Sequence, residues 1–184
     1  MKISKISAKT YTGKKVKPSV TVKVGDTTLK NGTDYTLSYS GNTEPGTATV
    51  TVAGKGRYDF AADVSFSIVL KAPTVKVTSS GSKKVLKWKA VLCPDKRWYK
   101  KDNSGMWYGY TGTEPDKYEI YCSVDGKDYS LLDTVSGKAV SYTAKKLEAG
   151  KTYKFKVRAC VTELKNGAEL SYKSPFSSAV SVKK

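Results

Sequence analysis

The residues best suited to binding chemistry lie in one aromatic and basic stretch, CPDKRWYKKDNSGMWYGYTGTEPD, which covers residues 93–116. Tryptophan and tyrosine rings stack on sugars or on partner side chains, and neighbouring cations favour acidic partners. The candidate ligand-binding residues are Arg97, Trp98, Tyr99, Lys100, Lys101, Trp107, Tyr108 and Tyr110. So many large side chains argue against a solvated tether, which ordinarily lacks aromatic residues. We therefore expect this segment to pack against something.

Two interpretations of this segment stay open. In the first, WYKKDNSGMWY forms a hairpin that turns at residues 103–105 and lays its rings on the surrounding protein. In the second, some rings stay exposed and bind a sugar or a protein. Because a hairpin directs alternate residues to opposite sides, both interpretations can hold together.

Residues for catalysis or metal binding are scarce. The chain has no histidine, which removes the usual general base for serine or cysteine nucleophiles and the commonest metal ligand. Acids such as Asp125 and Glu148 fall in segments that favour turns, which explains them better than paired glycosidase carboxylates do. The three cysteines, Cys93, Cys122 and Cys160, include no close pair for a zinc site. The sequence therefore predicts no enzyme, no metal and no cofactor.

Charge indicates which partners the surface attracts. The chain carries 33 Lys and Arg against 16 Asp and Glu, a net charge of +17. Such a surface attracts polyanions, but nucleic-acid recognition relies on arginine, and only Arg57, Arg97 and Arg158 are present. We expect no specific binding of nucleic acid. The lysines either keep the surface soluble or give an exported protein weak, salt-sensitive attraction to anionic wall polymers.

The hydrophobic pattern predicts an all-β chain. Helix signals are nearly absent, whereas Thr, Val, Tyr and Ser alternate between glycine-containing breaks about every ten residues. In GTATVTVAG, for example, Ala48, Val50 and Val52 are expected on one face of a strand. The first part of the chain thus predicts strands at 18–24, 35–40, 46–54 and 64–70. No apolar stretch approaches the roughly 18 residues of a membrane span.

The first part of the chain resembles the immunoglobulin-like repeats of Gram-positive surface proteins. The resemblance covers about residues 5–70, in which YTGK, GTDY, GTATVT and GKGRY occur in that order. It implies a bacterial immunoglobulin-like domain at residues 1–71. In such proteins the repeats serve chiefly as stalks and spacers.

After the join KAPTVKV, the second part resembles a fibronectin type III domain. The resemblance rests on Trp88 in the second strand, Leu147 before the GKTY turn, and Tyr153 at the start of YKFKVRAC. It implies a fibronectin type III-like domain at residues 72–184, with 93–116 as a long insertion between the second and third strands. Trp88 and Tyr153 are expected in its core, Tyr153 at the position of the tyrosine corner.

The same resemblance suggests what surrounds the insertion. It places Cys93 and Cys160 at one pole of the sandwich, where they form a candidate disulfide, with three reduced thiols as the alternative. Cys122 falls at the other end and is expected to be a buried or unpaired thiol. The connection ELKNGAELSYK, residues 163–173, leaves the first pole and is expected to form the other wall of a binding site.

Together these features predict two tandem β-sandwich domains from a secreted or wall-attached Gram-positive protein. The expected function is adhesion or carbohydrate binding at the cell wall or surface, with a glycan or a host or cell-surface protein as the ligand. The alternative is a purely structural spacer. Since neither a signal peptide nor a sorting motif is visible, we expect the chain to be a fragment of a longer extracellular protein.

Overall fold

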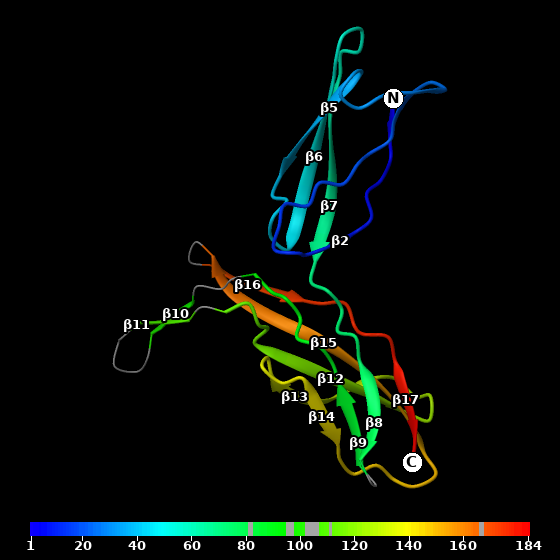
Figure 1. The fold of residues 1–184 in the computed structure, drawn as a ribbon, viewed down its shortest axis with the longest axis vertical. Helices are drawn as coiled ribbons and strands as arrows, with labels where there is room; N and C mark the ends of the chain where they lie inside the picture. The colour runs from blue at the N-terminus through cyan, green and yellow to red at the C-terminus, as the bar shows by residue number, and fades with distance from the viewer. Residues whose placement is uncertain (81–82, 95–97, 102–106, 111, 166–167) are drawn as a thin grey trace. The chain divides into compact units, whose positions relative to one another are not determined.

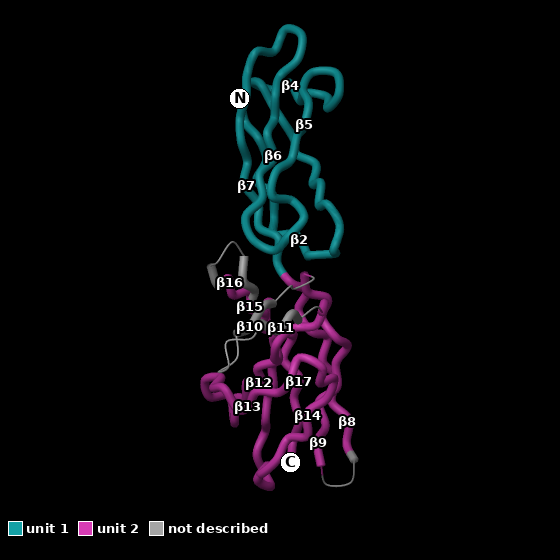
Figure 2. The backbone as a smooth tube through the Cα atoms, turned by 90° about the vertical axis from the view of Figure 1, so that its left-hand side faces the viewer, with its two compact units in different colours: residues 1–69 teal, residues 70–184 magenta. Residues whose placement is uncertain are grey.

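The chain forms two units built from β-strands. The computed structural model describes residues 1–80, 83–94, 98–101, 107–110, 112–165 and 168–184. All of the elements in these ranges are strands, as the sequence predicts, and no helix there is long and apolar enough to span a membrane. The compact units are Met1–Val69 and Leu70–Lys184, so the division falls two residues before the predicted one (Figure 2).

The first unit contains two sheets, and the strands of the larger one are labelled in Figure 1. The larger is ordered β2-β7-β6-β5, and comprises β2 (Lys9–Thr10), β5 (Tyr35–Ser40), β6 (Gly46–Gly54) and β7 (Ala61–Val69). The smaller comprises β1 (Lys2–Ile3), β3 (Val22–Val24) and β4 (Thr27–Thr28). The predicted strands at 35–40 and 46–54 are confirmed, whereas the predicted strand at 64–70 begins earlier, at residue 61.

The core of the first unit follows the alternation of β6. Ala48, Val50 and Val52 are buried, as predicted. The predicted strand at 18–24 is shorter than expected, because only residues 22–24 join a sheet. Before it, the carbonyls of Pro18 and Val20 accept hydrogen bonds from tyrosine hydroxyls of β5, at 2.9 and 3.0 Å. These contacts tie the segment to the larger sheet through side chains instead of a strand ladder.

The second unit has two sheets and a separate hairpin. One sheet, ordered β14-β9-β8, comprises β8 (Lys76–Ser80), β9 (Lys83–Lys87) and β14 (Ser141–Ala144). The other is ordered β13-β12-β15-β16, with β17 also paired to β15; its strands are β12 (Lys117–Val124), β13 (Ser130–Ser136), β15 (Thr152–Lys165), β16 (Ala168–Lys173) and β17 (Val180–Lys183). The hairpin consists of β10 (Trp98–Lys101) and β11 (Trp107–Tyr110).

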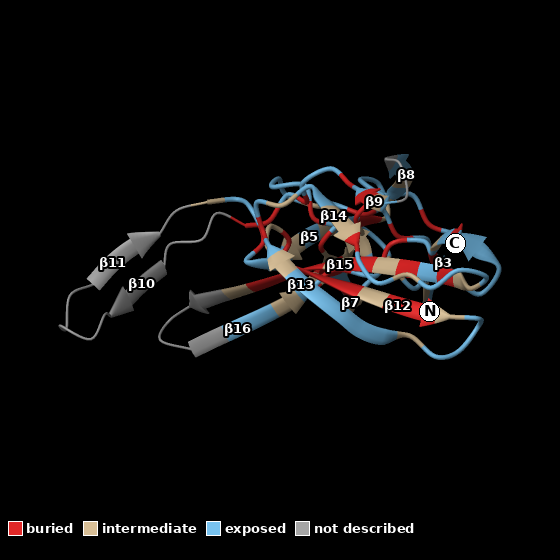
Figure 3. Cartoon of the chain, turned by 90° about the horizontal axis from the view of Figure 1, so that it is seen from below, coloured by how far each residue is buried: buried red, intermediate tan, exposed pale blue. Residues whose placement is uncertain are grey.

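The long antiparallel pair of β12 and β15 supplies much of the core of the second unit. Tyr118, Ile120, Phe155 and Val157 on this pair are fully buried. Figure 3 shows buried segments on both strands. The ring of Trp88, just after β9, lies 5.3 Å from that of Tyr118, which joins the two sheets. Trp88 is buried, so its predicted place in the core is confirmed.

Two local predictions in the second unit are also confirmed. The hydroxyl of Tyr153, whose ring is buried, accepts a hydrogen bond from the Glu148 N–H at 2.8 Å. This is the backbone contact expected of a tyrosine corner. Between β12 and β13, Asp125 and Gly126 have φ values of 50° and 80°. Successive positive φ angles form the tight hairpin turn that the Asp-Gly sequence predicts.

We expect the two units to unfold separately. Ile68→Ala in the first unit and Ile120→Ala in the second each remove a buried side chain and should each cost about 2–5 kcal/mol of unfolding free energy in their own unit. All three tryptophans lie in the second unit. In urea titrations, Ile120→Ala should therefore shift the tryptophan-fluorescence transition, and Ile68→Ala only the circular-dichroism transition of the first unit. An equal shift of the fluorescence transition by both variants would contradict separate unfolding.

Candidate functional site

Most of the predicted binding residues lie on the β10–β11 hairpin. Its antiparallel register pairs Trp98 with Tyr110 and Lys101 with Trp107. The predicted pairing of two strands within the insertion is therefore confirmed. The predicted turn at residues 103–105 and the candidate Arg97 lie outside the described residues.

The register divides the candidates between two faces of the hairpin. Residues directly opposite one another in an antiparallel pair share a face, and successive residues alternate. One face therefore carries the positions of Trp98, Lys100, Tyr108 and Tyr110, and the other carries those of Tyr99, Lys101 and Trp107. A flat ligand that stacks on one face thus meets only one of the two tryptophan positions. Residues of β10 also approach β15 of the same unit.

The ends of the insertion are fixed by backbone hydrogen bonds. The Cys93 N–H donates to the Thr113 carbonyl at 2.8 Å, which draws the two ends together. Asp116 then joins the insertion to β15: its N–H donates to the Cys160 carbonyl at 2.9 Å, and its carboxylate accepts from the Thr162 N–H at 2.6 Å. The hairpin therefore rises from an anchored base.

Gly137, at the end of β13, packs against this base. Its N–H donates to the Asp116 carbonyl at 2.9 Å, and a Cβ atom at this position would lie 1.6 Å from the Pro115 carbonyl oxygen. Only glycine fits here without displacing the backbone. A hollow of about 180 Å³ adjoins the contact, lined by Gly112, Glu114, Pro115, Asp116, Ser136, Gly137 and Lys138. Its volume is below the roughly 300–1,000 Å³ of ordinary ligand pockets.

The cysteines do not form the predicted bridge. All three are buried and none is joined in a disulfide. The Cys93 thiol lies near the Val91 carbonyl, next to the hydroxyl of Tyr118 on the inner side of β12. The Cys160 thiol lies beside Glu119, which faces the outer side. The sheet therefore separates the two thiols. Cys160 also lies within β15 and not at its end, and Cys93 lies well beyond the end of β9.

The prediction of a loop at residues 163–173 is wrong for the described residues. Strand β15 continues to Lys165, and β16 begins at Ala168 in direct register with it. The described part of this segment is thus an extension of the sheet. The sequence carried a signal for this, since Asn-Gly between two alternating segments favours a two-residue hairpin.

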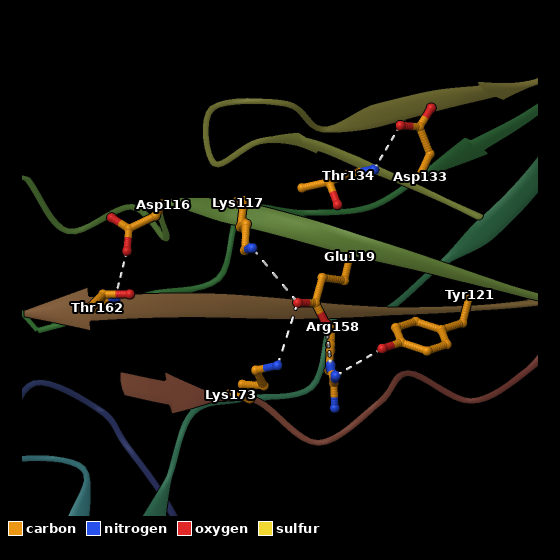
Figure 4. Close-up of polar contacts among 9 residues, drawn as sticks. All are labelled: Asp116, Lys117, Glu119, Tyr121, Asp133, Thr134, Arg158, Thr162 and Lys173. Carbon is orange, nitrogen blue, oxygen red and sulfur yellow. Dashed lines mark hydrogen bonds and ion pairs between the residues drawn. The ribbon is translucent and has the colours of Figure 1, made fainter. Parts of the chain in front are cut away.

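A charged cluster on the outer side of β12 and β15 was not predicted (Figure 4). The Arg158 Nε donates to the Glu119 carboxylate at 2.7 Å, and its Nη2 donates to the Tyr121 hydroxyl at 3.0 Å. The ammonium groups of Lys173 and Lys117 lie 3.5 and 3.9 Å from the same carboxylate. Glu119 and Arg158 occupy opposite positions in the β12–β15 register, which the sequence does not give.

The surrounding cations keep Glu119 ionised although it is buried. Burial raises the pKa of its carboxyl, but the hydrogen bond and charge of Arg158, with help from Lys173, outweigh burial. The net pKa lies below the ordinary 4.5. Burial lowers the pKa of the Arg158 guanidinium, but the hydrogen bond and the charge of Glu119 outweigh burial, so the net pKa is raised.

We expect Glu119→Gln to lower stability at neutral pH and to flatten its acid dependence. Because the folded-state pKa lies below 4.5, the ionised carboxylate stabilises the fold above that pH, and this contribution is lost as pH falls through the folded-state pKa. The expected loss at pH 7 is about 1–3 kcal/mol, because the change removes a charged hydrogen-bond partner. Urea titrations between pH 3 and 7 should show the variant and the wild type converging at the acid end.

The matched control for this prediction is Glu148→Gln. Glu148 pairs with Lys151 at 2.6 Å, but its side chain is 68% exposed, so solvent screens the pair. This variant should keep the stability and pH dependence of the wild type. A Glu119→Gln protein as stable as the control at pH 7 would contradict the stabilising role of the cluster.

Comparisons with known proteins identify no family for this chain. No protein family model and no curated protein matches it. Among solved structures, a β-1,2-glucanase from Parabacteroides distasonis matches with 19% sequence identity and a TM-score of 0.39. The match covers 74% of this chain but only 17% of the glucanase chain. A TM-score this low establishes neither a shared fold nor a shared activity.

Proposed function

We propose that this chain is a non-catalytic binding module of a secreted or wall-attached bacterial surface protein. Its ligand, a glycan or a host or cell-surface protein, contacts the β10–β11 hairpin. The observation that carries the proposal is that the insertion forms a paired hairpin, rich in aromatic and basic residues, on an anchored base. A rigid base lowers the entropy that binding must overcome.

Several features support the domain types in this proposal. In the second unit, the contact of Trp88 with Tyr118 and the hydrogen bond to the Tyr153 hydroxyl agree with a fibronectin type III-like sandwich. In the first unit, two sheets of short strands agree with an immunoglobulin-like domain. Under the proposal, this first domain acts as a stalk that holds the second away from the cell wall.

The alternative function is a structural spacer. It rests on the approach of β10 to β15, because a hairpin held against its own unit would cover part of its surface. Both functions involve the same hairpin. The binding function requires that one side of the hairpin is open to a partner, whereas the spacer function does not.

The two tryptophans of the hairpin should respond differently to substitution. Because Trp98 and Trp107 occupy positions on opposite faces, we expect one alanine variant to abolish binding at an unchanged melting temperature. The other should lower the unfolding free energy by about 3 kcal/mol or more, as loss of a buried aromatic ring does. A glycan and host-protein array with the whole 184-residue chain, followed by titration of the hits, measures the binding.

Tyr58→Ala is the matched control for the hairpin variants. Tyr58 is a partly exposed ring in the first unit with the guanidinium of Arg57 5.0 Å from its centroid, so it has a similar aromatic and basic character. It should leave array binding unchanged. Wild-type binding by both tryptophan variants would exclude the hairpin as the site, and loss of stability in both without a binding defect would favour the spacer.

A further inference from the structure

We propose that the outer side of the β12–β15 pair is a second binding site, which holds a linear anionic polysaccharide. We call it the cationic face, and it comprises Lys117, Lys154, Lys156, Arg158 and Lys173. It lies on the main sheet of the second unit and contains no residue of the hairpin, so it goes beyond the function proposed above.

The cationic face follows from strand alternation. On β15, Tyr153, Phe155 and Val157 are buried, so the alternate positions 154, 156 and 158 point away from the core. Residues on one side of a strand recur about every 6.8 Å, which spaces these three cations in a row. Lys117 on β12 and Lys173 on β16 extend the row, since both lie opposite residue 160.

Aromatic rings hold two of these cations in place. The Lys156 ammonium lies 4.2 Å from the ring centroid of Tyr129. The Arg158 guanidinium lies 4.5 Å from the ring of Phe176 and 5.2 Å from that of Tyr121. Contacts of this kind stabilise the cations in fixed positions. Binding an anion here therefore costs less side-chain entropy than binding it to free lysines.

The acid within the face does little to oppose an anionic ligand. Glu119 is met by Arg158 at 2.7 Å and by Lys173 at 3.5 Å, and its side chain is only 7% exposed. Its charge is therefore neutralised locally. The surface that meets the ligand is dominated by ammonium groups with side-chain exposures near 50%, as for Lys117 and Lys173.

The shape and chemistry of the face favour a polysaccharide over other polyanions. The cations already cover the faces of Tyr129, Tyr121 and Phe176, which leaves little room for bases to stack as single-stranded nucleic acids require. The face is the middle of a sheet, so a peptide cannot add to it as a strand. Leu131, 52% exposed and opposite Tyr121 in the β12–β13 register, offers apolar surface for the C–H faces of sugar rings.

A binding experiment with defined polymers tests this site. The 184-residue chain is titrated with dextran sulfate and with polygalacturonate, which distinguish sulfate from carboxylate as the anion, and with neutral dextran. Lys154→Gln/Lys156→Gln should weaken binding of at least one anionic polymer by about tenfold, the size expected from losing two partly screened ion pairs. Neither lysine contacts Glu119, so the fold should be kept, which the melting temperature verifies.

A second double variant removes the same charge from the other sheet. Lys76 and Lys87 are exposed and lie opposite one another on β8 and β9. Lys76→Gln/Lys87→Gln should change binding less than about twofold, because only general screened attraction is lost. Equal losses in the two double variants would overturn the proposal in favour of unspecific attraction by net charge.

The remaining measurements test whether another class of ligand binds better and whether the hairpin contributes to polysaccharide binding. Tighter binding of an oligothymidine or of poly-glutamate than of either anionic polysaccharide would overturn the choice of ligand, as would equal binding of neutral dextran. The hairpin variants Trp98→Ala and Trp107→Ala should keep polysaccharide binding where they keep the fold. Loss of it in a folded hairpin variant would overturn a separate site.

Discussion

The second unit depends on the alternation of side chains along the β12–β15 pair. Because neighbouring residues point to opposite sides, the same two strands build the apolar core on one side and the charged cluster on the other. Tyr118 and Glu119 are adjacent in sequence, yet one packs against Trp88 and the other is held by Arg158. A shift of the register by one residue would place Glu119 in the core, where its charge would lack partners.

Features set by neighbouring residues could be predicted from the sequence. The strands at 35–40 and 46–54 have the bounds that the sequence predicts, because their alternation and flanking glycines are local signals. The Asp125–Gly126 turn follows from the positive φ that these residues tolerate. Trp88 and Tyr153 were placed in the core by resemblance to a known domain, and their burial agrees with it. For the candidate site, sequence reasoning located a hairpin but not which residues face each way.

What could not be predicted depends on pairing between distant segments. The hydrogen-bonded side chains of Glu119 and Arg158 are 39 residues apart, and only the register shows that they are opposite. The expected Cys93–Cys160 bridge is absent for a related reason. The resemblance predicts the end of the sandwich at which each cysteine lies, but only the strand register shows on which side of the sheet each thiol lies. In the 163–173 segment, the described residues pair as β15 and β16, whereas the resemblance implies a connection between strands.

Because the base of the insertion is anchored, the hairpin can be replaced while the rest of the unit keeps its structure. The hydrogen bond from Cys93 to Thr113 brings the ends of the insertion together before β12 begins. The free energy of closing a loop grows slowly, by about 0.6 kcal/mol for each doubling of its length. A hairpin of another length or sequence can therefore be held on the same base with the core unchanged. The sequence of the hairpin can then change without altering the residues that fold the sheet.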